Sequence, residues 1–144
     1  MDFQGTYELR LDAKNRLSIP AGDRHKFADG VVLFAGIEGC VEVWPTAGWD
    51  AFIDTTLGGR TRLSADTRRL ARHFGENSWN TTLDTAGRVL LPKELIAHAA
   101  LDREVTLKGA ADIYEIWDRA TAAQAEDGHE ESVYDLAERL ARER

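Results

Sequence analysis

The stretch Leu11-Asp12-Ala13-Lys14-Asn15-Arg16-Leu17-Ser18-Ile19-Pro20 recurs 72 residues later as Leu83-Asp84-Thr85-Ala86-Gly87-Arg88-Val89-Leu90-Leu91-Pro92. The leucine, aspartate, arginine and proline fall in register, and apolar residues match between the copies. After one inserted residue the similarity resumes, because Glu42-Val43-Trp44 corresponds to Glu115-Ile116-Trp117. Self-similarity at a fixed offset is the signature of a repeat architecture. The chain therefore contains one structural unit twice.

Each copy predicts the element order β-turn-β-α-β-β. Before the first turn, Tyr7, Leu9 and Leu11 alternate with polar residues, which is the period of a half-buried strand. Asn15 and its counterpart Gly87 suit a turn position with positive φ. The proline that ends each motif suits the first turn of a helix, since its missing N–H costs nothing there. Two more strands are expected per copy, at 31–34 and 40–44 and at 104–108 and 113–117.

A unit of about 45 residues buries too little core to be stable alone. We therefore expect the two copies to interlock about a pseudo-twofold axis as a swapped-hairpin β-barrel. The predicted fold class is mainly β with short helices (α+β), with linker helices and a C-terminal helix. The predicted segments are a first repeat at 1–47, a helical arginine-rich linker at 48–76, a second repeat at 77–120 and an acidic, partly helical tail at 121–144.

The linker and the tail carry helix signals. In the linker, Thr46 and Ser64 are candidate N-caps of two helices. In the tail, an acidic stretch at 126–131 is expected to be solvated, and Ser132 opens a last helix with Asp135 three residues on, close to a capping box. That helix has a narrow apolar stripe, which would dock on the body of the protein or on a neighbouring subunit. The stripe consists of Val133, Leu136, Ala137 and Leu140.

Composition and charge exclude several classes of protein. The 144 residues are 43% hydrophobic and 30% charged, with a net charge of −7, which argues against a simple polybasic nucleic-acid binder. No apolar run approaches the roughly 20 residues of a membrane span, and no signal segment opens the chain. A single cysteine, Cys40, fits a reducing cytoplasm. Locally, residues 60–72 hold five arginines against one aspartate, so basic surface is possible on an acidic body.

The repeated turn is the candidate site, and two interpretations of it stand. In the first, Asp12 and Asp84 accept turn N–H groups and pair with Arg16 and Arg88, which makes them structural turn pairs. In the second, each arginine projects toward a phosphate or a guanine edge, where its planar fork can bond bidentately. Lys14 and Asn15 make the first loop tip cationic and rich in donors. The candidate DNA-binding residues are Lys14, Asn15, Arg16 and Arg88.

Together these motifs resemble the MraZ family, whose members are built from two SpoVT-AbrB-type repeats. The resemblance runs from about Phe3 to Trp117 and rests on residues 11–20, 39–45, 84–92 and 114–118. It implies a ring-shaped homo-oligomer that binds double-stranded DNA at tandem repeats in the promoter of its own division and cell-wall operon. It also implies transcriptional control, usually repression, in the cytoplasm at the nucleoid. Two departures are Gln4, where a basic residue is frequent, and Asn15, where glycine is more usual.

Two other functional classes are weighed against this one. An enzyme is disfavoured because the four histidines are scattered, Gly58-Gly59 has no following lysine, and no serine sits in a nucleophile elbow. We therefore expect no catalytic residues, no metal or cofactor and no small-molecule substrate. The alternative function is a ring-forming assembly or inhibitor protein that acts through a protein partner, with DNA binding secondary.

Overall fold

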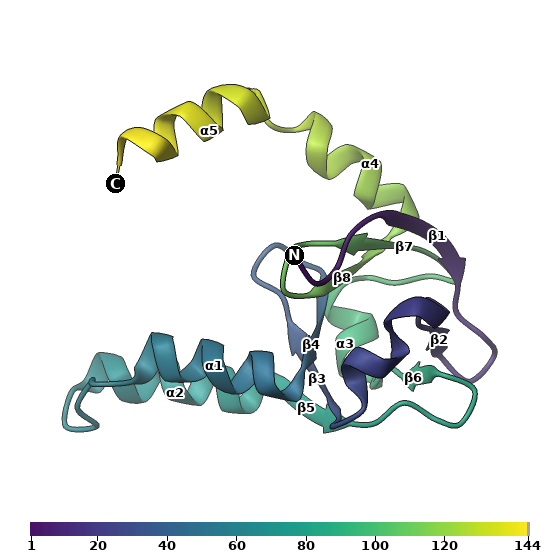
Figure 1. Cartoon of the computed structure of the whole chain (residues 1–144), viewed down its shortest axis with the longest axis horizontal. Helices are drawn as coiled ribbons and strands as arrows, with labels where there is room; N and C mark the ends of the chain where they lie inside the picture. Colours follow the sequence, from purple (N-terminus) through teal and green to yellow (C-terminus); the bar gives the residue numbers. More distant parts are fainter. Residues whose placement is uncertain (144) are drawn as a thin grey trace.

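The computed structural model describes residues 1–143 and is mainly β with short helices, so the predicted α+β class is confirmed (Figure 1). The strands are β1 (Thr6–Arg10), β2 (Arg16–Ser18), β3 (Val31–Ala35), β4 (Val41–Pro45), β5 (Ser78–Thr81), β6 (Arg88–Leu90), β7 (Glu104–Gly109) and β8 (Tyr114–Asp118). The helices are the 3₁₀ helix η1 (Ala21–Phe27) and the α-helices α1 (Thr46–Leu57), α2 (Ala65–Glu76), α3 (Lys93–His98), α4 (Arg119–Asp127) and α5 (Val133–Arg142). No helix within residues 1–143 has both the length and the apolar composition needed to cross a membrane.

The two repeats exchange their first strands. The large sheet has the order β1-β7-β8-β4-β3-β5, and replacing each strand by its counterpart in the other repeat gives the same order read from the opposite edge. Strand β1 of the first repeat pairs antiparallel with β7 of the second, and β5 of the second pairs with β3 of the first. The second strands, β2 and β6, pair with each other in a separate two-stranded sheet. The predicted interlocking of the repeats is therefore present in the strand pairing.

The main core lies between the two sheets. Alternate residues of the large sheet, such as Val43, Leu107 and Ile116, form one buried cluster with Leu17 and Val89 of the small sheet. Since both sheets and both repeats contribute to one cluster of buried side chains, neither repeat can keep this core without the other. The interlocked arrangement thus solves the problem of a unit too small to bury its own core.

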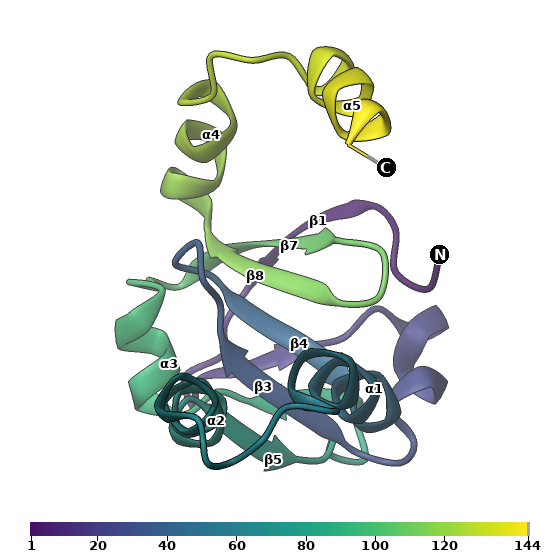
Figure 2. The ribbon, with the colours of Figure 1, turned by 90° about the vertical axis from the view of Figure 1, so that its left-hand side faces the viewer.

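Helices α1, α2 and α4 cover the outer face of the large sheet. Phe34 and Trp44 on that face pack against the α1–α2 hairpin through Trp49, Phe52 and Phe74. The shorter α4 covers the other half of the sheet through two alanines and Trp117. Figure 2 shows α1 and α2 side by side, while α5 stands clear of the sheets beyond α4. The order α4-α5 after β8 repeats the order α1-α2 after β4, so the repeat is longer than the sequence pattern indicates.

The first residues of the helices test the predicted N-caps. Ser64 and Ser132 are N-caps as predicted, since their side chains accept the N–H groups of Thr67 and Asp135. The prediction that Thr46 is an N-cap is wrong, because Thr46 is the first residue of α1 and Pro45 occupies the N-cap position, with φ −62° and ψ 145°. The proline ring already fixes the backbone entry, so the helix begins one residue earlier. Part of the acidic stretch expected to be solvated, up to Asp127, belongs to α4.

Candidate nucleic-acid interface

The two repeated turns lie side by side because β2 pairs with β6. Each turn also donates to its neighbour: the N–H of Leu91 bonds to the carbonyl of Asn15 at 2.9 Å, and the N–H of Ile19 bonds to the carbonyl of Gly87 at 3.0 Å. Asn15 has φ 60° and Gly87 has φ 76°, the left-handed conformation expected for these residues. Two motifs 72 residues apart in the sequence therefore form one surface feature.

Asp12 organises the first turn. Its Oδ1 accepts the N–H groups of Lys14 and Arg16, each at 2.9 Å, and its Oδ2 accepts the Arg16 Nε at 2.7 Å. The backbone N–H of Arg16 is the strongest influence on this carboxyl, and with the guanidinium and the Lys14 N–H it lowers the pKa of Asp12 from 3.8 to about 2. Asp12 is therefore ionised at neutral pH and holds Arg16 by both its backbone and its side chain.

Asp84 makes the same contacts in the second turn, and the two turns are linked by charge. It accepts the N–H groups of Ala86 and Arg88 and the Arg88 Nε, each at 2.9 Å, and these bonds lower the pKa of Asp84. Arg16 Nη1 lies 4.0 Å from Asp84 Oδ2, and Arg88 Nη1 lies 3.9 Å from Asp12 Oδ2. These four side chains, each 28–34% exposed, form a cross-repeat charge cluster that is neutral overall. Net attraction for phosphate must therefore come from cations around the cluster.

Two further arginines, which the sequence motifs do not contain, contact the turns. Arg103 Nη1 donates to the carbonyl of Asp12 at 2.6 Å and to Oδ1 of Asn15 at 3.1 Å. Arg24 Nε donates to the carbonyl of Ile19 at 2.9 Å and lies over Gly87, where an added Cβ would fall 2.1 Å from Nε. A residue larger than glycine at position 87 would displace Arg24. No sequence signal links these arginines to the turns, because the strand exchange brings Arg103 to Asp12.

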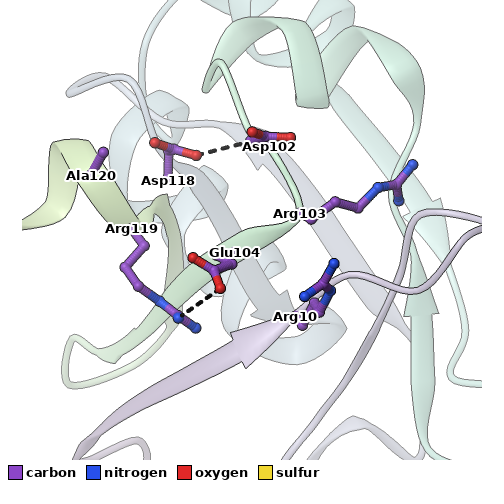
Figure 3. A pocket seen from close by; sticks show the side chains of 7 residues that line it. All are labelled: Arg10, Asp102, Arg103, Glu104, Asp118, Arg119 and Ala120. Carbon is purple, nitrogen blue, oxygen red and sulfur yellow. Dashed lines mark hydrogen bonds and ion pairs between the residues drawn. The ribbon is translucent and has the colours of Figure 1, made fainter.

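Arg10 lies beside Arg103, next to the first turn. Figure 3 shows the side chains of Arg10 and Arg103 close together where β1 ends and β7 begins, at a pocket of about 350 Å³. In the same pocket Arg119 turns instead toward Glu104, with Nη1 to Oε1 at 3.6 Å, and also donates to the carbonyl of Leu9. Arg10 and Arg103 are the exposed cations here, beside the exposed carboxylates of Asp102 and Glu104. Both arginines also border a hollow at the first turn.

All six residues predicted for the site lie on this one surface. Lys14 is exposed at the tip of the first turn, where the second turn has Ala86. The cluster and the cations that contact it comprise five positive side chains and two carboxylates, on a protein whose net charge is −7. The positive side chains are Lys14, Arg16, Arg24, Arg88 and Arg103. This surface is therefore locally basic and lies mostly on the side of the first repeat.

A second cluster of polar groups lies elsewhere on the sheet. Cys40, Glu42 and Glu115 place one ligand atom each within 4.8 Å of one another, a grouping compatible with a metal ion. Burial raises the pKa of the Cys40 thiol and of the Glu42 carboxyl, which favours their neutral forms. Glu42 and Glu115 already accept the indole N–H of Trp44 and Trp117, each at 3.0 Å. Both glutamates therefore already have a structural role: they face each other where β4 pairs with β8, and each accepts a tryptophan N–H.

Comparisons with known proteins place the chain in a family. A family model described as "MraZ protein, putative antitoxin-like" matches residues 3–72 and 76–144, which includes the C-terminal tail left outside the resemblance above. A curated relative from Nocardioides sp., named transcriptional regulator MraZ, is 36% identical over 98% of this chain and 97% of its own. Relatives of the same name are 40% identical in Cupriavidus taiwanensis, over 86% of this chain and 87% of theirs, and 31% identical in Christiangramia forsetii, over 94% and 90%. The chain belongs to the MraZ family.

Proposed function

We propose that this protein is a sequence-specific DNA-binding transcriptional regulator that represses its own division and cell-wall operon. The observation that carries the proposal is the pairing of two arginine-bearing turns on one basic surface of an acidic protein. Curated relatives named as transcriptional regulators support the same class of function. The proposed partner is double-stranded DNA, met at the nucleoid.

In this proposal the aspartates of the turns position the arginines, and Lys14 adds positive charge. Asp12 and Asp84 bond the arginines through Nε, and each Nη1 reaches the opposite aspartate only at 4.0 or 3.9 Å. The Nη groups of Arg16 and Arg88 thus remain donors for a phosphate or a guanine edge. Lys14 at the tip is a mobile point charge suited to a phosphate. Because the central charges cancel, contact by a single subunit is weak and sensitive to salt.

Assembly into a ring overcomes this weakness. Identical turns at fixed spacing would meet tandem promoter repeats together, and linked contacts of this kind raise affinity by about 10² to 10⁴ without new contact types. Sequence choice then comes from one or two side chains per turn, repeated along the DNA.

Fluorescence anisotropy on DNA from upstream of the gene tests the proposal, with shuffled DNA as the control. Wild type, Arg16→Ala and Arg60→Ala are compared at several salt concentrations. Arg60 is a charge-matched control because it lies in the loop between α1 and α2. Figure 1 shows that loop far from β2 and β6.

We expect preference for the native DNA, steep salt dependence and loss of binding only in Arg16→Ala. Equal binding to both DNAs, unaffected by Arg16→Ala, would reject the proposal. The alternative, a ring that acts on a protein partner, would gain support if Arg16→Ala abolished DNA binding and left repression in cells intact.

A further inference from the structure

Three side chains of the kinds that bind metals meet on the outer face of the large sheet. Cys40 directly precedes β4, Glu42 lies on β4 and Glu115 lies on β8, and one ligand atom of each is within 4.8 Å of the others. Figure 2 shows β4 and β8 side by side in the middle of the sheet, where the two glutamates are direct partners. Like charges opposite each other destabilise a sheet, so a cation between these carboxylates would stabilise it.

The protein itself supplies no such cation. Within residues 1–143, no lysine, arginine or histidine forms an ion pair with either glutamate. Lys108, the partner of Glu115 on β7, lies instead over the ring of Trp117, with Nζ 5.2 Å from the ring centre. The same ammonium donates to the carbonyl of Ala122. The two opposed carboxylates therefore lack a direct counter-ion.

The Cys40 thiol points into this group and has no other partner. Cys40 is 1% exposed, and in the described part of the chain its Sγ bonds to no residue other than Cys40 itself. An added Cβ at Gly36 would fall 2.6 Å from this Sγ, so the glycine leaves room for the sulfur. Burial, and after it the charges of Glu115, Glu42 and Glu38, raise the pKa of the thiol. A bound metal ion would reverse this effect, because a coordinating thiol is deprotonated.

Two tryptophans orient the carboxylates. Trp44 and Trp117 each donate the indole N–H to Oε1 of the glutamate two residues earlier, at 3.0 Å. The Oε2 atoms of Glu42 and Glu115 accept no hydrogen bond from the residues that the structure describes. One oxygen of each carboxylate is thus fixed and the other is free, which is how neighbouring groups commonly hold carboxylates that bind metals.

The donor set favours zinc. A thiolate combined with carboxylates suits a borderline-soft divalent ion, whereas Mg²⁺ and Ca²⁺ take oxygen ligands. Bonds of about 2.0 Å to oxygen and 2.3 Å to sulfur keep ligand atoms within roughly 4 Å of one another, so small rotations of the glutamates would close the set. A fourth position remains for water or for Glu38. Ile113 stands where Cys40 stands in the first repeat, so each chain offers one such site.

We propose that Cys40, Glu42 and Glu115 bind one Zn²⁺ ion per chain and that this ion links the two repeats. The thiol proton is released to solvent on binding. Strand β4 belongs to the first repeat and β8 to the second, and they pair over three residues each, against five for β1 with β7. The ion would strengthen this short central pairing. The inference does not rest on DNA binding, because the repeated turns belong to the other sheet.

Cadmium titration of EDTA-treated protein tests the site, since a Cd²⁺–thiolate bond has its own ultraviolet charge-transfer band. Cys40 is the only cysteine, so the band reports this site and no histidine or acidic tail residue. Calorimetry with Zn²⁺ then gives affinity and stoichiometry. The variants are Cys40→Ser, Glu42→Gln and Glu115→Gln, and Glu76→Gln at the exposed end of α2 is the control.

We expect a band that saturates at one Cd²⁺ per chain, is displaced by Zn²⁺ but not by Mg²⁺, and is absent in Cys40→Ser. Each glutamine variant at positions 42 and 115 should weaken Zn²⁺ binding by at least about tenfold, since even the groups behind metal ligands contribute about 10- to 100-fold. Glu76→Gln should bind as wild type does.

The glutamine variants also separate loss of the site from loss of the fold. Without metal they remove the like-charge repulsion and should melt no lower than wild type, which circular dichroism verifies. Added Zn²⁺ should raise the melting temperature of wild type more than theirs. A wild type without the Cd²⁺ band, or Zn²⁺ binding that is unchanged in both glutamine variants, would overturn the proposal.

Discussion

Replacing Ala86 by lysine would give the second turn the cation that Lys14 gives the first. The two positions are equivalent, since the N–H of each bonds at 2.9 Å to Oδ1 of the aspartate two residues before it. Both residues are exposed, and Ala86 is not part of the core. The substitution therefore changes charge at one turn tip, and exposed substitutions of this kind shift stability by only about 0.5 kcal/mol.

The size of the effect follows from counterion release. Each phosphate contact contributes about 0.9 to the slope of log K against log salt concentration, so one added contact is worth about 3.5-fold between 50 and 200 mM salt. Every subunit that places its second turn on DNA adds the same increment. If several second turns contact DNA, the Ala86→Lys ring should show a much steeper slope than wild type. If only first turns contact DNA, the slope of Ala86→Lys should equal that of wild type.

Salt titrations of operator binding measure this slope for wild type, Ala86→Lys and Ala86→Gln, a variant of similar length without the charge. We expect a steeper slope for lysine only. We also expect Ala86→Lys to restore part of the slope that Lys14→Ala loses. An unchanged slope in Ala86→Lys, combined with a clear loss in Lys14→Ala, would refute the idea that the second turn and Arg88 reach DNA.

Three more predictions concern stability. Asp12→Asn should make the stability less dependent on pH in acid. The low pKa of Asp12 stabilises the fold above pH 3.8, and this stabilisation is lost as the pH falls toward about 2; melting temperatures from pH 5 to 2 check this. Glu42→Gln should stabilise the protein increasingly as pH rises from 4 to 7, because burial, and after it the charge of Glu115 opposite, make ionisation of Glu42 unfavourable and raise its pKa; a melting temperature that does not rise at pH 7 would count against this. Leu17→Ala should cost about 2–5 kcal/mol in denaturant unfolding, whereas Leu90→Ala, on an exposed face, should cost well under 1 kcal/mol.

The elements around the repeated turn could be predicted because local rules agree there. Alternating residues, a turn residue tolerant of positive φ and a following proline all indicate the same short hairpin and helix, and the duplication doubles the signal. Interlocking could be predicted from size alone, because neither copy can bury its own core. The pairing of Arg16 with Asp84 follows from that interlocking, although no local pattern contains it.

The contacts of Arg24 and Arg103 with the turns could not be predicted from the sequence. Arg103 reaches the first turn because β1 pairs with β7 of the other repeat. Arg24 bonds locally to Ile19 and reaches Gly87 of the second turn because β2 pairs with β6. Helix α4 was also missed, since its first residues follow a strand directly and its only buried side chain is Ala122. A helix held by alanines gives almost no hydrophobic periodicity to detect.

Duplication has kept the scaffold of the turns while their charges have diverged. Both aspartates bond their arginines at nearly the same distances, so the neutral cross-repeat charge cluster is the part of the surface that is alike in the two repeats. The cations outside the cluster are not symmetric: Lys14, Arg10 and Arg103 surround the first turn, whereas Arg24 alone joins the second. A surface of this kind has a direction, so each subunit would meet DNA with its first turn leading. In a ring of identical subunits, such as the proposed function assumes, that direction would be the same at every contact, which fits tandem promoter repeats.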